Sequence, residues 1–254
     1  MNNVLCIQNL SVSVKGQALV QNISFDICES EAILLSGANG VGKSTVLKAI
    51  LQVETEGKRF TGQIVERSFG DVISLKQPEL QHYRRSIAYV PQKDEYAEMG
   101  NIQVRDIISE SSSIFSGKSL SISEVNDLID FWLPPQAGKK RVFDAKSKPA
   151  KFSGGEQRLL SVLSIVATRS SSELLIIDEP LNNLDFTNAG NVSNLLNRVI
   201  QENPKTALLM ISHCRIFPFI TREVMLTPNG ISTLPEHYVC HSCIGEPDES
   251  GFYV

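Results

Sequence analysis

The chain lacks the long apolar runs that would cross a membrane. A bilayer-spanning helix needs roughly 18 or more consecutive apolar residues, whereas the longest apolar stretches here, at 174–177 and 207–211, have only the length of buried strands. The first residues also lack a basic segment followed by a long apolar core, so no secretory signal is predicted. We therefore expect a protein that is soluble by itself.

Cysteine and positive charge are also scarce. The five cysteines, at positions 6, 28, 214, 240 and 243, are odd in number and scattered, which argues against a disulfide scaffold and favours a reducing cytosol. Lysine and arginine total 24 against 28 acidic residues, and this net charge of −4 does not indicate binding along a nucleic acid backbone. With 42% hydrophobic residues among 254, the chain can still bury the core of one large or two-lobed domain.

Apolar periodicity predicts the first elements of the fold. The first 30 residues alternate apolar and polar positions around Lys15-Gly16, which predicts an antiparallel hairpin. The apolar run at 31–36 predicts a buried strand. A glycine-rich turn follows, and the apolar positions of residues 43–52 then share one helical face. The local order is strand, glycine loop, helix.

The rest of the chain continues in an α/β pattern. Residues 60–90 have the pattern of further strands, and residues 94–170 change to serine-rich loops and amphipathic helices. Strands that alternate with helices predict a mainly parallel sheet flanked by helices. The later core elements are a strand at 174–178, a helix at 192–200, a strand at 206–212 and a terminal hairpin at 224–234.

Residues 37–44 read Gly-Ala-Asn-Gly-Val-Gly-Lys-Ser and fit the phosphate-loop pattern G-x-x-x-x-G-K-[ST] between a predicted strand and a predicted helix. Glycines let successive backbone N–H groups point at phosphate oxygens, and the helix N-terminus adds its positive dipole end. Lys43 can reach the β and γ phosphates, and the Ser44 hydroxyl can hold Mg²⁺. This segment predicts a nucleoside triphosphate site.

Two adjacent carboxylates, Asp178 and Glu179, end the apolar strand at 174–178. Uncompensated charge at the end of a buried strand is costly, which indicates a bound cation or a proton-transfer task. We expect Asp178 to bind Mg²⁺ directly or through water. We expect Glu179 to polarise the water that attacks the γ-phosphate.

Residues 152–157, Phe-Ser-Gly-Gly-Glu-Gln, begin a predicted helix about 25 residues before Asp178 and form a second anion site of glycines and a serine hydroxyl. Beside the phosphate loop and the acidic pair, this segment resembles the signature Leu-Ser-Gly-Gly-Gln of the ATP-binding cassette (ABC) superfamily. The resemblance covers about residues 4–235. It implies an α/β fold: a P-loop NTPase core with a mainly parallel sheet, an N-terminal antiparallel β subdomain and an inserted helical subdomain.

The resemblance also implies how the chain is divided. It predicts a single ABC ATPase domain over residues 1–254. Its parts are the core with the antiparallel β lobe (1–93 and 171–235), the helical lobe (94–170) and a C-terminal tail (236–254).

Further family marks follow in the expected order. Gln92 matches the glutamine loop, Asp185 ends the segment after the acidic pair, and His213 matches the switch histidine. The implied catalytic residues are Lys43, Glu179 and His213, and the implied Mg²⁺ ligands are Ser44, Gln92 and Asp178. The implied ATP-binding residues are Gly37, Ala38, Asn39, Gly40, Val41, Gly42, Lys43, Ser44, Thr45, Gln92, Ser153, Gly154, Gly155, Glu156 and Asp185.

Several positions depart from the family pattern. Val14 stands where an adenine-stacking aromatic is common, which leaves open how adenine is held. Glu156 replaces the usual glutamine, and Arg158-Leu159 replaces the usual Gln-Arg. These replacements leave open the hydrogen bonding beneath the signature helix.

The resemblance implies the ATP-binding and ATP-hydrolysing subunit of an ABC transporter. Such a subunit acts as a homo- or heterodimer on a separate membrane permease, at the cytoplasmic face. A soluble, non-transport ABC ATPase with an assembly, repair, translation or defence partner is the alternative, and no residue names the substrate. The tail residues His237, Cys240, His241 and Cys243 have zinc-ligand side chains without a second half-site, so metal binding and an exposed tail both stay open.

Overall fold

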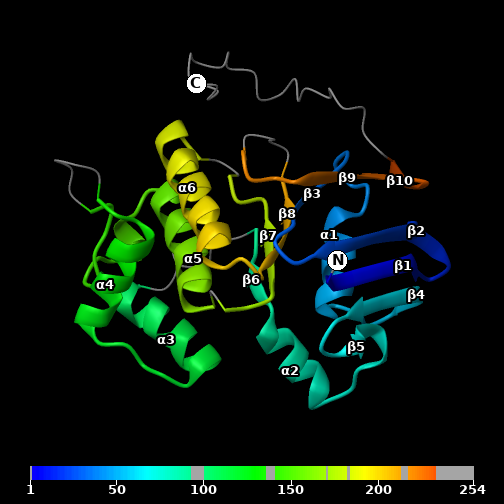
Figure 1. Ribbon diagram of the computed structural model, residues 1–254, viewed down its shortest axis with the longest axis horizontal. Coiled ribbons are helices and arrows are strands. Elements are labelled where there is room, and N and C mark those ends of the chain that lie inside the picture. Colours follow the sequence, from blue (N-terminus) through cyan, green and yellow to red (C-terminus); the bar gives the residue numbers. More distant parts are fainter. Residues whose placement is uncertain are drawn as a thin grey trace. The chain divides into compact units, whose positions relative to one another are not determined.

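The computed structural model describes residues 2–92, 100–135, 141–169, 171–181, 184–212 and 217–232, with the backbone alone at position 186. Contacts divide the chain into two compact units (Figure 1). The first contains the described residues within 1–87, 173–178 and 204–254, and the second contains those within 88–172 and 179–203. The division into core, helical lobe and tail that the family implies stays a prediction.

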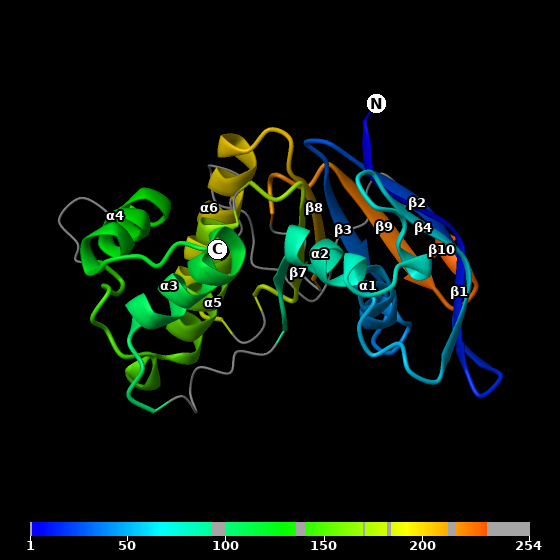
Figure 2. The ribbon, with the colours of Figure 1, turned by 90° about the horizontal axis from the view of Figure 1, so that it is seen from below.

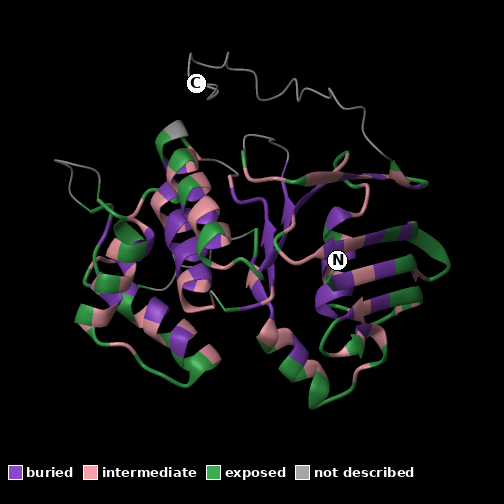
Figure 3. Ribbon diagram, in the orientation of Figure 1, coloured by how far each residue is buried: buried purple, intermediate pink, exposed green. Residues whose placement is uncertain are grey.

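An antiparallel sheet of order β2-β1-β4-β5 forms one part of the first unit (Figure 2). Lys15 and Gly16 join its first two strands with positive φ angles of 50° and 81°, which confirms the predicted hairpin. Many alternate residues of these strands are buried, because one face packs on the core while the other meets solvent (Figure 3). The strands are β1 (Asn3–Val14), β2 (Gln17–Cys28), β4 (Lys58–Glu66) and β5 (Gly70–Asp71).

The second sheet of the first unit has the order β10-β9-β3-β8-β7 within that unit. Its strands are β3 (Ala32–Ser36), β7 (Leu174–Asp178), β8 (Ala207–Ile211), β9 (Arg222–Thr227) and β10 (Gly230–Ser232). All neighbours are parallel except β10, which pairs antiparallel with β9. β7 and β8 are buried along their whole length, as expected for parallel strands covered on both faces. The predicted mostly parallel sheet is confirmed.

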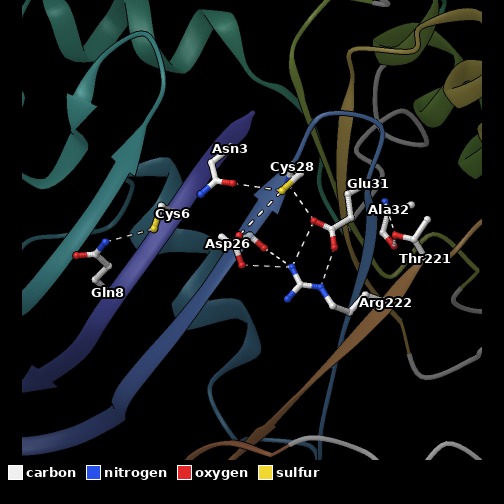
Figure 4. Close-up of polar contacts among 9 residues, drawn as sticks. All are labelled: Asn3, Cys6, Gln8, Asp26, Cys28, Glu31, Ala32, Thr221 and Arg222. Carbon is white, nitrogen blue, oxygen red and sulfur yellow. Dashed lines mark hydrogen bonds and ion pairs between the residues drawn. The ribbon is translucent and has the colours of Figure 1, made fainter. Parts of the chain in front are cut away.

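Arg222, at the start of β9, connects this strand to the end of β2 and to Glu31 just before β3 (Figure 4). Its Nε donates to Glu31 Oε1 at 2.7 Å, and its Nη2 donates to Asp26 O within the same cluster. Beside it, the Thr221 hydroxyl donates to Ala32 O at 3.0 Å. These contacts fix the start of β3, so they help to position the glycine loop that follows its other end.

The expectation of strands through residues 60–90 is confirmed where it opens, by β4, and where it closes, by β6 (Ala88–Val90), and it is wrong between β5 and β6. After β5 the chain forms a 3₁₀ turn, η1 (Val72–Ser74), and then α2 (Glu79–Ser86), before the short strand β6 (Ala88–Val90). Among its residues α2 buries only Tyr83, so its sequence has no apolar stripe of helical period. Its signals are an acidic first turn and a basic last turn, which complement the helix dipole.

Packing against α1 (Lys43–Leu51) explains why α2 forms. The Tyr83 hydroxyl donates to Ile50 O at 2.6 Å, and Arg84 Nε donates to Leu51 O at 3.2 Å. The last carbonyls of a helix have no partner within that helix, and these side chains supply one. α2 therefore caps the C-terminal end of the helix whose N-terminal end follows the glycine loop.

Helices form most of the described part of the second unit (Figure 1). α5 contacts α3, α4 and α6, and most of its residues are buried. The helices predicted within 94–170 and at 192–200 are confirmed. No helix among the described residues combines the length and apolar character needed to span a bilayer. The helices are α3 (Val104–Ser116), α4 (Ile122–Trp132), α5 (Gly154–Thr168) and α6 (Phe186–Glu202), with a 3₁₀ turn η3 (Pro149–Lys151) before α5.

Candidate functional site

The loop between β3 and α1 requires glycine at both ends. Gly37 and Gly42 have φ angles of 137° and 111°, a region that other residues rarely adopt. A Cβ at Gly37 would lie 2.5 Å from Leu226 O, and one at Gly42 would lie 2.2 Å from Val20 Cγ1. The loop can therefore run this close to β9 and β2 only because these two positions lack a side chain.

Lys43 begins α1 and folds back over the loop. Its ammonium donates to Gly37 O at 2.7 Å and to Ala38 O at 3.1 Å, and the residue is only 7% exposed. The N-terminus of α1 has no side-chain cap and no acidic residue in its first turn. Backbone N–H groups, dipole and ammonium thus all favour an anion at this loop.

Asp178 ends β7 at the same sheet edge as the glycine loop. Asp178 and Leu35 both pair with Ile211 of β8, one from each side. Adjacent strands lie about 4.8 Å apart, so the backbones of Asp178 and Leu35 are roughly 10 Å apart. Since the glycine loop begins two residues after Leu35, a buried carboxylate and an anion-binding loop share one edge of the sheet.

The oxygen donors at this edge suit Mg²⁺. They are the Asp178 carboxylate and the hydroxyl of Ser44, an exposed residue in the first turn of α1. Magnesium is commonly bound by few protein oxygens, with water and substrate phosphate as the other ligands. The described residues contain no group of three or more His, Cys, Asp or Glu side chains that could hold a metal by themselves. The donor set therefore fits a cation that also binds phosphate.

Glu179, in the second unit, has a strained backbone. Its φ of 49° lies in the left-handed region, and the residue is only 8% exposed. Non-glycine residues in this region cost on the order of 1–2 kcal/mol, and such strain is concentrated at functional sites. Six other non-glycine residues among those described, including the exposed Lys15 and Glu54, have φ angles of 50–63°, so what distinguishes Glu179 is that it combines this conformation with a buried carboxylate.

The signature segment begins α5 with a capping box. Ser153 Oγ accepts from Glu156 N at 3.2 Å, and Glu156 Oε2 accepts from Ser153 N at 2.8 Å. The replacement of the family's usual glutamine by Glu156 thus has a local explanation, because the Glu156 carboxylate accepts a hydrogen bond from a backbone N–H at the start of the helix. A serine hydroxyl that accepts one hydrogen bond still carries a proton that can donate to an anion.

Gly155 packs directly against Asn188, a residue that the sequence reasoning missed. A Cβ at Gly155 would lie 2.4 Å from Asn188 Nδ2. The same Nδ2 donates to Asp185 Oδ2 at 2.8 Å, and Asn188 N donates to Asp185 Oδ1 at 2.8 Å. These bonds lower the pKa of Asp185, which is the N-cap of α6. The spacing Asp-x-x-Asn at a helix start was the available signal.

Some of the remaining predicted site residues are exposed or half-buried, and others lie outside the described residues. Gln92 is exposed and follows Pro91 after β6, and Val14 is half-buried at the end of β1. His213 lies outside the described residues, as does the cysteine- and histidine-containing tail. Exposed positions of the glycine loop are Ala38, Asn39 and Gly40, and half-buried ones are Val41 and Thr45.

Sequence comparison agrees with this geometry. The family model described as ABC transporter matches residues 20–182. An uncharacterized ABC transporter ATP-binding protein of Haemophilus influenzae is 33% identical over 205 residues, which cover 81% of this chain and 72% of that protein. The zinc import ATP-binding protein ZnuC of Buchnera aphidicola is 26% identical over 241 residues, which cover 94% of this chain and 84% of that protein.

Solved structures share the fold. The dimeric structure of a bacterial ABC transporter cassette has a TM-score of 0.72 at 21% identity, covering 90% of this chain and 96% of that chain. A dimeric cassette in a post-hydrolysis state, bound to ADP and Pi, has a TM-score of 0.71 at 21% identity, with the same coverage.

Proposed function

This chain belongs to the ABC transporter family, and on that premise we propose that it powers a transporter as one half of a head-to-tail pair of cassettes. The family makes it an ATP-binding protein and an ATP hydrolase. Transport is favoured over a cassette ATPase with a non-membrane partner, because the named relatives are transporter ATP-binding proteins. The observation that carries the proposal is the Lys43 loop on the same sheet edge as Asp178.

Lys43 and the glycine loop are proposed to hold the β and γ phosphates. The ammonium exchanges its bonds to Gly37 O and Ala38 O for phosphate oxygens, and the uncapped N–H groups of α1 donate to the same anion. Ser44, Asp178 and Gln92 are the proposed Mg²⁺ ligands. When bound, the ion neutralises charge on the β and γ phosphates.

Glu179 is the proposed general base. Its carboxylate accepts a proton from a water whose oxygen attacks the γ-phosphorus, while the bond to the β-phosphate oxygen breaks and ADP leaves. His213 is proposed to contact the γ-phosphate, as the switch histidine does in the family.

The paired state follows from two anion-binding segments of similar chemistry. Helix α1 begins after Gly42 without a side-chain cap, helix α5 begins at Gly154 and Gly155 behind the Ser153–Glu156 capping box, and the two helices belong to different compact units. ATP held by the glycine loop of one copy is proposed to contact Ser153, Gly154 and Gly155 of a second copy. Binding then favours closure of the pair, and hydrolysis removes the bridging charge.

The proposed partner is a membrane permease on whose cytoplasmic side the pair docks. The cargo is not assigned, because similar relatives carry different names: zinc import for ZnuC, manganese transport for MntB and oligopeptide transport for OppF, all at 25–28% identity. Recovery of the chain from membranes with an apolar, multi-spanning protein is expected. Recovery only with a non-membrane protein would favour the alternative.

The Glu179→Gln variant tests the hydrolytic role. It is expected to bind ATP with the affinity of the wild type, to lose at least about 100-fold in turnover and to accumulate an ATP-bound dimer, since binding and chemistry use different groups. Turnover with and without Mg²⁺, nucleotide affinity and size-exclusion profiles measure this. Glu202→Gln, at the exposed end of α6, is the matched control and should turn over normally. Undiminished hydrolysis by Glu179→Gln would remove Glu179 from the role of base.

A further inference from the structure

A buried arginine in the second unit, Arg158, donates hydrogen bonds to two other segments of that unit. Arg158 lies four residues after the start of α5 and is only 2% exposed. Its Nη1 donates to Pro91 O at 2.6 Å, its Nη2 to Glu179 O at 3.2 Å and its Nε to Pro180 O at 3.3 Å. The acceptors are backbone oxygens of the residue before Gln92, of Glu179 and of the residue after Glu179. One side chain thus joins the signature helix to the loop of the proposed Mg²⁺ ligand Gln92 and to the loop of the proposed base Glu179.

The guanidinium group is the side chain suited to this task. Burying a cation is costly unless its donors are satisfied, and a guanidinium has five N–H donors in a rigid planar fork. Each of the three guanidinium nitrogens donates to a different carbonyl here, and a lysine ammonium cannot reproduce that planar geometry. The fork therefore fixes the relative positions of the three backbone oxygens as well as bonding each of them.

The strained backbone at Glu179 gives this contact a specific consequence. Outside an exposed turn, a buried glutamate stays at a φ of 49° where its surroundings hold it there. Arg158 donates to the carbonyl of Glu179 and to the next carbonyl along the chain, which belong to the two peptide bonds on either side of Pro180. These bonds oppose rotation of the segment into a relaxed conformation. The direction of the Glu179 side chain depends on that rotation.

We propose that Arg158 is a positioning residue for hydrolysis: it holds the Glu179 backbone in its left-handed conformation and couples it to the signature helix and to the loop of Gln92. The proposal rests on the proposed role of Glu179 as the base. Arg158 does not touch the reacting atoms. A displacement of the first turns of α5 is transmitted through the guanidinium to the carbonyl of Glu179, so chemistry depends on where the signature segment lies.

Two substitutions test the proposal in the full-length chain. Arg158→Met keeps a long side chain and removes every donor, and Arg158→Lys keeps the charge and removes the fork. For Arg158→Met we expect a loss of about 10- to 100-fold in kcat, with the KM for ATP within about twofold of wild type, because misplacement of a catalytic group slows chemistry without removing a phosphate contact. Arg158→Lys should recover part of the loss. Arg169→Met is the control, since Arg169 lies at the other end of the same helix, over the Phe115 ring, and its loss should leave kcat unchanged.

A double-mutant cycle with Glu179→Gln separates positioning from a general structural role. If Arg158 acts through Glu179, Arg158→Met should slow single-turnover hydrolysis by less than about twofold in the Glu179→Gln background. Additive losses, or equal losses of ATP affinity and kcat, would overturn the proposal. If Arg158→Met fails to fold by circular dichroism, Arg158→Lys decides, and a wild-type kcat in that variant would also overturn it. Absence of turnover in the wild-type protein would instead contradict the proposed function.

Discussion

The contact between Gly155 and Asn188 allows a matched comparison of two adjacent glycines. Gly154 and Gly155 are the first two residues of α5, and they share one sequence environment. A Cβ at Gly154 would meet nothing within 4 Å, whereas one at Gly155 would lie 2.4 Å from Asn188 Nδ2 and 2.8 Å from its Cγ. The Asn188 amide cannot move away freely, because it is buried and donates to Asp185 Oδ2 at 2.8 Å. Substitution by alanine should therefore destabilise the protein at Gly155 and not at Gly154.

The expected magnitudes follow from packing and from helix propensity. Adding atoms to a contact that is already packed lowers the free energy of unfolding by about 1–3 kcal/mol. Replacing glycine by alanine in a helix raises it by up to about 1 kcal/mol. Gly155→Ala should lower the free energy of unfolding by about 1–2 kcal/mol, or roughly 2–8 °C in Tm for a chain of this size. Gly154→Ala should leave Tm unchanged or raise it by a few degrees.

Thermal unfolding of the nucleotide-free proteins, followed by circular dichroism, measures both effects. A third variant, Gly155→Ala with Asn188→Ala, removes the two closest atoms and leaves Asn188 Cβ at 3.0 Å, so it should recover part of the lost stability. Equal Tm values for the two single variants would contradict the packing argument. A double variant no more stable than Gly155→Ala would show that the clash with the Asn188 amide is not the cause.

Two further predictions concern charged side chains. Lys43→Ala should weaken ATP binding at least about tenfold, because it removes the ammonium that lies over the glycine loop. Lys48→Ala, on the same helix, is the control and should bind ATP as the wild type does. Isothermal titration calorimetry measures the ATP affinity of both variants. At the start of α4, hydrogen bonds from Lys118 and from Ser121 lower the pKa of Glu124 from 4.5 to about 2. A lowered pKa contributes stability that is fully present above pH 4.5 and is lost as the pH falls through about 2. The Tm difference between wild type and Glu124→Gln should therefore be largest near neutral pH and disappear below pH 2. A difference that does not change with pH would contradict this assignment.

Much of the fold could be predicted because its signals are local. The hairpin at Lys15-Gly16 and the buried strands of the mixed sheet follow from apolar alternation and short apolar runs. α2 was missed because it buries one side chain and its stability comes from contacts with carbonyls about 33 residues earlier. Such a helix leaves almost no periodic signal in its own sequence.

In the candidate site, too, the short local motifs could be predicted from the sequence and the contacts between distant residues could not. The glycine loop, the acidic pair at 178–179 and the signature segment were recognisable as residue types at fixed spacing, since each is a short segment whose chemistry lies within a few residues. Asn188 was not recognisable as a partner of Gly155, which lies 33 residues away. The acceptors of Arg158 could not be predicted either, because backbone oxygens carry no sequence signature.

The sequence by itself therefore determined the elements, the phosphate-binding loop and the family to which the chain belongs, since these depend on local propensity and on short-range spacing. Tertiary structure alone decided that Asp178 and Leu35, in the strand before the glycine loop, pair with the same residue of β8, that Glu179 adopts a left-handed backbone and that Arg158 donates to the Glu179 carbonyl. Those features depend on which distant segments meet and on how closely their backbones approach. Contacts between distant backbones leave no pattern in the order of side chains.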